Sequence, residues 1–334
     1  MATRMPTLTR RVLATTVSGL ALFGLFQTAG CGDNFDPKSL LNSYRVIGIQ
    51  ADKPALPADG STQVRVFDFD PASLQGARTT SASVKYAWHL CLYSLGSAGE
   101  YKCAAEQLDL LVPGDGPEVT LDLGPNGLDL PGKVPILQAL AAQFLGTTTP
   151  ITRLSAVLEL TSGSPEIGEV KTVKNLTIFL PGDPEADKPN HNPTLTNLRV
   201  NGNPVCPKAG VTEGCAVAWP AESTTLDLTI ELGDNAAEVC TPSDLAARRC
   251  DTETGRESLF LTWYTTEGKL KFGNTNQQTL ENMVSLPADL LNPDETVHPV
   301  RLFVALRDGR GGLDVAEGYF SLTRPLKKAS SHRK

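Results

Sequence analysis

The sequence lacks the short motifs by which many enzymes are recognised. It contains no Gly-x-Ser-x-Gly turn, no His-Glu-x-x-His helix, no phosphate-binding glycine-rich loop and no Cys-x-x-Cys pair. It also lacks an uninterrupted apolar run of the ~20 residues that a membrane-spanning helix needs. Basic residues are outnumbered, with 30 Lys and Arg against 37 Asp and Glu, and the net charge of −7 disfavours binding to nucleic acid. We therefore predict no enzyme, no catalytic residue, no cofactor and no nucleic-acid partner.

The composition is that of an ordered, turn-rich protein. Hydrophobic residues make up 40% of the chain, which is too apolar for a disordered acidic segment. The 29 Gly and 24 Pro residues interrupt the sequence too often for a helical bundle or coiled coil. At roughly 150 residues per domain, the 334 residues leave room for two domains once a targeting segment is removed.

The N-terminus has the three parts of an export signal. A basic head with Arg10 and Arg11 precedes the apolar run Val12–Phe26, and small residues follow up to Cys31. Residues Thr28 to Cys31 resemble a bacterial lipobox, although Thr28 stands where such motifs usually carry Leu. The resemblance implies that residues 1–30 are removed, that Cys31 is lipidated and that residues 31–43 form a tether. A conventional cleavage site is the alternative, and both the general secretory and the twin-arginine export routes stay open.

The cysteine count agrees with export. Seven cysteines are an odd number, but six remain to pair if Cys31 carries lipid. Among the possible connectivities, sequence neighbours favour three local disulfides. A zinc site built from the last four cysteines is the alternative, but their spacing does not match the usual two-to-four-residue knuckles, so we predict no metal site. The favoured pairs are Cys91 with Cys103, Cys206 with Cys215, and Cys240 with Cys250.

Period-two alternation of apolar and polar residues dominates the rest of the chain and predicts antiparallel sheets with one wet face. Each half has a tryptophan in such a strand, Trp88 in the first and Trp263 in the second. We predict an all-β protein with two tandem immunoglobulin-like sandwiches, at residues 44–182 and 193–323. The alternating sets are Val64 and Val66; Val84, Tyr86, Trp88, Leu90 and Leu92; Leu154, Ala156, Leu158 and Leu160; Leu226, Leu228, Ile230 and Leu232; Leu259, Leu261 and Trp263; and Val300, Leu302, Val304 and Leu306.

Two segments depart from the strand pattern. The linker 183–192 is rich in Pro and in carboxylate and amide side chains, so we predict a semi-rigid, solvated connection, with a calcium-stiffened junction as the alternative. Apolar residues recur at helical spacing just before Gly146, which predicts one helix that covers an edge or end of the first sandwich. The apolar face expected for this helix consists of Ile136, Leu137, Leu140, Ala141 and Phe144.

The remaining polar motifs carry weak signals. The segment Asp308–Gly312 favours a hairpin turn over an ion-binding loop. The basic tail 324–334 could contact an anionic surface or the cell wall, and plain disorder is the simpler interpretation. The histidines are scattered along the chain, so we expect solvated side chains rather than a metal or catalytic cluster; they are His89, His191, His298 and His332.

Several segments together resemble exported lipoproteins of the myxobacterial type. They are residues 44–54, the strand 86–91, the Asn192-Pro193 restart and residues 304–312. The resemblance implies a location and a fold, but it supplies no activity. We expect a lipid-anchored protein of the cell envelope, with the outer membrane favoured, that faces the periplasm or the cell surface.

The expected role of the protein is non-catalytic binding or scaffolding, with an envelope protein or glycan as ligand. The stapled loops 91–103 and 206–250 are the candidate surfaces. One alternative is an enzyme or accessory domain that acts on polysaccharide, which would gather carboxylates in a cleft and raise the pKa of one of them. The other alternative is a purely structural spacer.

Overall fold

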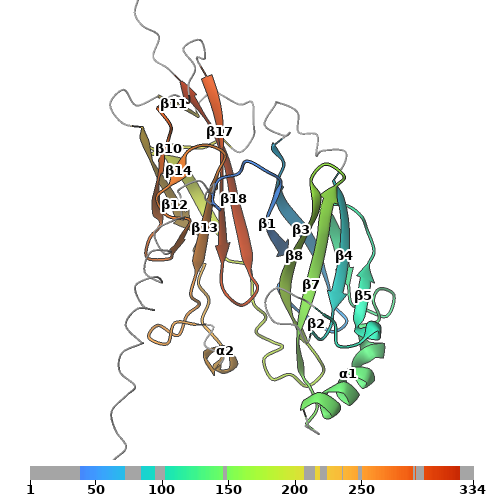
Figure 1. Ribbon diagram of the computed structural model, residues 1–334. Coiled ribbons are helices and arrows are strands. Elements are labelled where there is room, and N and C mark those ends of the chain that lie inside the picture. Colours follow the sequence, from blue (N-terminus) through green and yellow to red (C-terminus); the bar gives the residue numbers. More distant parts are fainter. Residues whose placement is uncertain are drawn as a thin grey trace, which may run out of the picture. The chain divides into compact units, whose positions relative to one another are not determined.

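Four β-sheets form two β-sandwiches, and the proline-rich segment between β8 and β9 connects them (Figure 1). The computed structural model describes residues 38–71, 84–94, 102–145, 149–206, 215–218, 224–234, 236–246, 250–288, 290 and 297–323. The predicted export signal 1–30, Cys31 and the basic tail 324–334 lie outside the described residues. Within these described ranges, no helix has the length and apolar character needed to cross a membrane.

The first sandwich packs a three-stranded sheet against a five-stranded sheet around Trp88. Val64 and Val66 of one sheet and Trp88 and Leu90 of the other are buried in one core, as the alternating pattern predicts. The indole N–H of Trp88 donates to the carbonyl of Gly116 at 3.0 Å, so the polar group of the ring is satisfied. The three-stranded sheet consists, in order, of β1 (Arg45–Ala51), β3 (Ser61–Phe69) and β6 (Glu118–Asp122). The five-stranded sheet consists, in order, of β2 (Ala55–Pro57), β8 (Gly168–Phe179), β7 (Arg153–Ser164), β4 (Lys85–Cys91) and β5 (Asp109–Val112).

The second sandwich is built in the same way around Trp263. Its core includes Leu228 and Leu302, and the Trp263 indole donates to the Thr275 hydroxyl at 2.9 Å. One five-stranded sheet consists, in order, of β10 (Asn203–Pro204), β9 (Leu195–Val200), β12 (Thr225–Leu232), β16 (Glu281–Ser285) and β14 (Lys269–Leu270). The other consists, in order, of β11 (Ala216–Ala218), β18 (Leu313–Thr323), β17 (Val297–Arg307), β13 (Phe260–Thr265) and β15 (Asn274–Asn276).

Both sandwiches have the strand pairing of immunoglobulin-like domains. Near the start of each, a short strand crosses to the opposite sheet and pairs in parallel with the last strand, β2 with β8 and β11 with β18. The last strand also pairs antiparallel with the strand before it. This crossing covers a backbone edge that would otherwise be free. The predicted fold class is confirmed, whereas the boundaries 44–182, 183–192 and 193–323 stay predictions.

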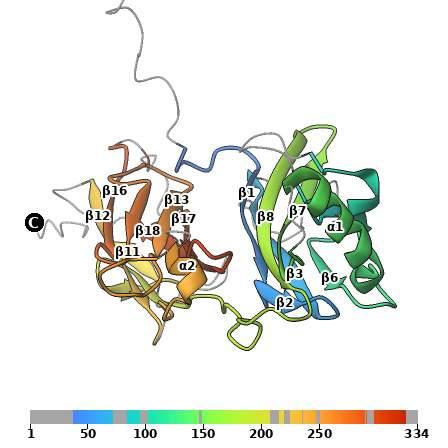
Figure 2. The same ribbon diagram turned by 90° about the horizontal axis from the view of Figure 1, so that it is seen from below.

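The predicted helix forms but starts earlier, and its inward face includes the expected Leu137 and Leu140. Helix α1 (Leu130–Leu145) lies beside the first sandwich in both views (Figures 1 and 2). Leu130 and Leu137 are buried in the first core, and Val134 packs against them. The prediction that Ile136 belongs to the buried face is wrong, since Ile136 is exposed. Leu130, Val134 and Leu137 are spaced four and three residues apart, so they lie on one face of the helix and form its apolar stripe. The described residues also include α2 (Pro242–Ala246) and the 3₁₀ turn η2 (Glu106–Leu108).

The two sandwiches share an apolar contact surface. Phe303 and Ala305 on the outer face of β17 pack with Ile47 of β1 and Phe69 of β3. The Phe69 and Phe303 rings meet edge to face, with centroids 6.3 Å apart. A wet outer face is expected for β17, but every residue from Val300 to Leu306 is buried. The alternation fails here because the first sandwich, rather than water, covers the second face of the strand.

The described end of the predicted tether is also packed. Leu41 is buried in the same apolar contact surface. Its backbone N–H donates to the Thr265 carbonyl at 2.8 Å, and the Thr265 N–H donates to the Ser39 carbonyl at 2.9 Å. Residues 39–41 of the predicted tether 31–43 are therefore held against the second sandwich, and the tether itself stays a prediction. The backbone pairs with the second sandwich before it enters the first.

Three disulfides staple local segments of the chain. They join Cys91 to Cys103, Cys206 to Cys215, and Cys240 to Cys250, which are the neighbouring pairs favoured by the sequence. Cys91 ends strand β4, and Cys103 packs at the margin of the first core, so this bond does not connect the two sheets of its sandwich. Each closed loop is short, and the chain-entropy model assigns about 3 kcal/mol to such a bond.

Candidate functional site

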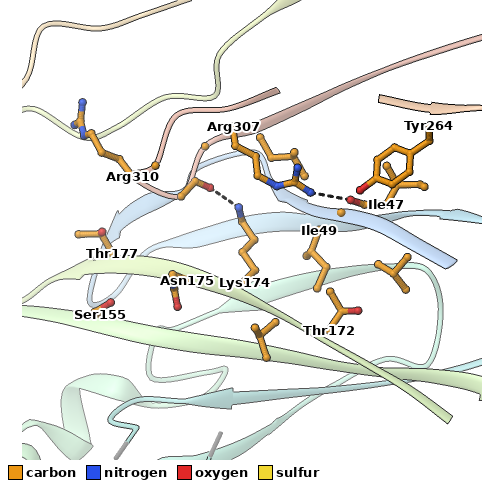
Figure 3. A pocket seen from close by; sticks show the side chains of 17 residues that line it. Ile47, Ile49, Ser155, Thr172, Lys174, Asn175, Thr177, Tyr264, Arg307 and Arg310 are labelled. Carbon is orange, nitrogen blue, oxygen red and sulfur yellow. Dashed lines mark hydrogen bonds between the residues drawn. The ribbon is translucent and has the colours of Figure 1, made fainter. Parts of the chain in front are cut away.

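A cleft of about 470 Å³ lies between the first sandwich and the loop that joins β17 to β18 (Figure 3). We call it the inter-sandwich cleft. Strands β1 and β8 of the first sandwich form one wall, and the second sandwich contributes Tyr264, Arg307 and the loop 309–312. Lys174 and Arg307 bring positive charge to the cleft, while no Asp or Glu lines it. This combination makes the cleft the first candidate for a ligand site.

Lys174 reaches the cleft from β8. Its ammonium donates to the carbonyl of Gly311, so a side chain of the first sandwich holds the backbone of the second (Figure 3). The lysine is 7% exposed. Burial lowers the pKa of Lys174 to about 8; nearby Asp308 opposes this shift and nearby Arg307 adds to it. Lys174 is not among the residues predicted from the sequence. A signal for its burial exists, since Lys174 lies on the same face of the strand as the buried residues Leu176 and Ile178.

Arg307 crosses the same boundary in the opposite direction. From the end of β17, its guanidinium donates to the carbonyl of Ile47 in β1 at 2.9 Å. A second N–H donates to the Thr262 hydroxyl at 3.2 Å. Both acceptors are neutral. Neither Arg307 nor Lys174 forms a salt bridge with any residue that the structure describes.

The hairpin prediction for 308–312 is correct, and the two ends of the loop, Asp308 and Gly312, are buried. The Asp308 carboxylate is fully buried and accepts the backbone N–H groups of Arg310 and Gly312, each at 2.8 Å. Its other oxygen accepts the Asn190 amide at 2.7 Å. A Cβ atom on Gly312 would lie 2.0 Å from this carboxylate, so the close approach requires glycine. The loop therefore anchors the linker.

Behind the loop, Arg310 is surrounded by carboxylates and points away from Lys174 (Figure 3). Its guanidinium lies 2.8 Å from Glu257, 3.2 Å from Asp244 and 3.6 Å from Glu238. Burial, followed by the charge of Asp308, raises the pKa of Glu257 to about 7, although Arg310 and a backbone N–H oppose the shift. We call these four residues together with Asp308 the Arg310 cluster.

The linker is solvated only in part: Asp187 and Lys188 are exposed, but other side chains contact the two sandwiches. Asp183 is paired with Arg153, whose guanidinium makes two bonds to it at 2.7 and 3.0 Å and also lies 2.8 Å from Glu185. This pairing lowers the pKa of Asp183 against the effect of burial. Asn192 donates to the Ala51 carbonyl and accepts the Leu313 N–H. Four of the five candidate calcium ligands, Asp183, Glu185, Asn190 and Asn192, thus contact protein groups, whereas Asp187 is exposed. The described residues contain no cluster of three His, Cys, Asp or Glu suited to a metal ion.

The described histidines lie apart, each beside a carboxylate. His89 is 3.3 Å from Asp109, and His191 is 2.7 Å from Glu238. His298 pairs with Glu267 at 3.1 Å and is less solvated than predicted, with 19% of its side chain exposed. His332 lies outside the described residues, as do 95–101 and 207–214 of the stapled loops. None of the three histidines that the structure describes lines the cleft.

No protein-family model and no curated protein matches the sequence. Among solved structures, similarity is found to dimeric latent PorU from Porphyromonas gingivalis, with 11% identity, a TM-score of 0.21, and coverage of 85% of this chain and 24% of that chain. The Ig1-2 module of the Drosophila receptor protein tyrosine phosphatase DLAR has 8% identity and a TM-score of 0.21, with coverage of 85% and 100%. A 1.5-MDa bacterial ice-binding adhesin has 9% identity and a TM-score of 0.21, with coverage of 86% and 66%.

The chain thus spans about a quarter of the PorU chain and about half of a Drosophila N-cadherin EC1-4 chain to which it is also similar. TM-scores near 0.2 support no conclusion about function. The immunoglobulin-like assignment rests on the strand order and pairing described above. The three disulfides indicate a location outside the cytoplasm, where thiols can stay oxidised.

Proposed function

We propose that the chain is an exported lipoprotein of the bacterial cell envelope, anchored through lipid on Cys31, and that its two sandwiches act as one rigid, non-catalytic binding or scaffolding module. The lipobox-like residues 28–31 and the disulfides support the location. The cell envelope offers glycans and other proteins as ligands, and loop tips and clefts of β-sandwiches commonly bind such partners.

The buried contact between the linker and the β17–β18 loop is the observation that carries the proposal. Linkers between domains usually allow relative motion. Here Asn190 and Asn192 bind the loop and strand of the second sandwich, and Asn192 also binds the first. The apolar contact surface around Phe69 and Phe303 adds buried area on the same boundary. A module that holds its two halves in fixed positions can present one continuous binding surface.

The Arg310 cluster bears on the enzyme alternative. It gathers carboxylates and raises the pKa of Glu257, which are features expected of a catalytic acid. However, Glu257 and Asp308 are both 0% exposed, and Arg310 occupies the space between the carboxylates. None of these carboxylates lines the inter-sandwich cleft. A substrate would not reach Glu257 or Asp308, and this burial supports a structural role for the cluster and a non-catalytic module.

Rigidity can be measured with two spin labels, one in each sandwich, introduced as Lys171→Cys and Lys269→Cys in the full chain with Cys31 replaced by Ser. We expect one narrow distance distribution by pulsed electron resonance. Asp308→Asn should broaden it, whereas Asp251→Asn, at a turn carboxylate outside the cluster, should not. A broad distribution in the otherwise unchanged chain would remove the rigid module from the proposal. The anchor is tested separately by intact-mass analysis of natively isolated protein, which should show acyl chains on Cys31.

A further inference from the structure

We propose that the inter-sandwich cleft binds the carboxylate of an acidic saccharide, with the Lys174 ammonium and the Arg307 guanidinium as the groups that hold the anion. This inference gives the proposed binding module a ligand class and rests on that proposal. It is carried by the geometry of the cleft and by the balance of charge inside it.

The charge in the cleft is compensated only in part, because the charge of Asp308 favours the Lys174 ammonium from behind the loop but no Asp or Glu lines the cleft itself. Lys174 and Arg307 both line the cleft, and the acceptors that each contacts are neutral oxygens. Asp308 is near Lys174, but its oxygens are already used by the linker amide and the loop N–H groups. Burying like charges without a counter-ion is costly, and an anion placed between them would offset that cost.

Both cations also keep donors for a ligand. An ammonium has three N–H donors, and the structure assigns one of them to Gly311. A guanidinium has five, and the structure assigns two, to Ile47 and Thr262. The planar fork of arginine suits the two oxygens of a carboxylate, and the lysine supplies a point charge beside it. Two such donors on opposite walls fix both the position and the orientation of an anion.

The rest of the lining suits the uncharged part of a sugar. Hydroxyl and amide side chains come from Thr172, Thr177 and Asn175, and the Tyr264 ring stands at one end of the cleft (Figure 3). Sugar hydroxyls pair with such groups, and aromatic rings pack against sugar C–H faces. A cleft of about 470 Å³ is within the ~300–1,000 Å³ range of small-ligand sites. These groups favour a hydroxyl-rich acid over a bare inorganic anion.

Binding of a carboxylate should be linked to the protonation of Lys174. Its pKa near 8 means that part of the lysine is neutral in mildly alkaline solution. A bound anion favours the charged form, so binding at pH 8 should take up protons and affinity should fall as the pH rises above 8. A site built only on permanently charged arginine would lack this dependence.

The test is titration calorimetry on the full chain with glucuronate, glucose and inorganic phosphate as probes. We expect glucuronate to bind, with proton uptake at pH 8, and glucose and phosphate to bind at least tenfold more weakly. Lys174→Met should weaken glucuronate binding about tenfold or more, because it removes a charge-assisted bond while keeping the length of the side chain. Lys171→Met is the matched control, since Lys171 lies on the same strand, is exposed and does not line the cleft.

Four results would overturn the inference: no binding of glucuronate, equal binding of glucose, binding of phosphate as tight as that of glucuronate, or unchanged affinity in Lys174→Met. If Lys174→Met does not fold, the test is the proton uptake of the unaltered chain when it binds glucuronate. Absence of proton uptake at pH 8 would overturn the role of Lys174. The spin-label distances report on the rigid module independently of any sugar. A chain with one narrow distance and no glucuronate binding would contradict this inference alone.

Discussion

Lys174 and Arg307 cross the boundary between the two sandwiches in opposite directions. Lys174 of the first sandwich binds the Gly311 carbonyl of the second, and Arg307 of the second binds the Ile47 carbonyl of the first. Each cation thus holds the partner sandwich by its backbone. Because both use neutral acceptors, the same contacts that join the sandwiches also leave the cleft between them positively charged.

Gly312→Ala should destabilise the protein. The added Cβ would lie 2.0 Å from an Asp308 carboxylate oxygen and 2.9 Å from the His191 carbonyl, so the loop and the linker would have to separate. We expect a loss of about 2–4 kcal/mol in the free energy of unfolding, measured by urea denaturation. Gly273→Ala is the control, because nothing lies within 4 Å of its added Cβ. Equal losses in the two variants would contradict the close packing of the loop.

Asp308→Asn tests the hydrogen bonds at the same place. An amide can keep only part of the acceptor role of the carboxylate, and its NH₂ group would face the Asn190 amide or the loop N–H groups. We expect a cost of about 2–4 kcal/mol from the donors left unpaired in a buried site. Asp251→Asn serves as the control, since Asp251 also accepts two backbone N–H groups but in a solvated turn. A cost for Asp308→Asn no larger than that of the control would show that the loop does not anchor the linker.

The disulfides should differ in cost when they are removed. Replacing either Cys91 and Cys103 or Cys240 and Cys250 by Ser loses a loop constraint of roughly 3 kcal/mol. The second loop also carries Asp244, which pairs with Arg310. We therefore expect the Cys240/Cys250 double variant to melt at a lower temperature than the Cys91/Cys103 double variant. The reverse order would indicate that the Arg310 cluster does not depend on this loop.

The sequence was sufficient for the fold because the relevant signals are local. Period-two patterns such as Leu226 to Leu232 specify which face of a strand is apolar, and they predicted the strands of both sandwiches. The boundary between the sandwiches depends on contacts between distant residues. Lys174 meets Gly311, and Asn190 meets Asp308, across more than a hundred positions.

The linker prediction was incomplete for the same reason. Proline and carboxylate side chains indicate a solvated connection when only their neighbours are considered, yet the Asp183 side chain is buried and pairs with Arg153. Two local signals of the contact between the sandwiches did exist in the sequence. Lys174 stands in phase with core residues of its strand, and β17 is apolar on both faces from Leu302 to Leu306. A strand that is apolar on both faces indicates a second covering layer, which here is the first sandwich.

Glu257→Gln should change how stability depends on pH. The pKa of Glu257 rises from 4.5 to about 7 because the carboxylate is buried and lies near Asp308. A folded-state pKa above the unfolded value means that the native state binds more protons between these values, so the free energy of unfolding should fall as the pH rises from 4.5 to about 7. The size of this decrease is up to about 3 kcal/mol for a shift of this kind.

Since glutamine does not titrate, the variant should lose this slope while it still accepts the Glu238 N–H. Denaturation at several pH values between 4.5 and 8 measures the difference, with the exposed Glu281→Gln as control. A steep slope that persists in Glu257→Gln would assign the proton to another group. If the free energy of unfolding of the unaltered chain does not fall over this pH range, Glu257 is fully ionised in the folded state because Arg310 compensates its burial. Glu257 and Arg310 would then form a permanent ion pair.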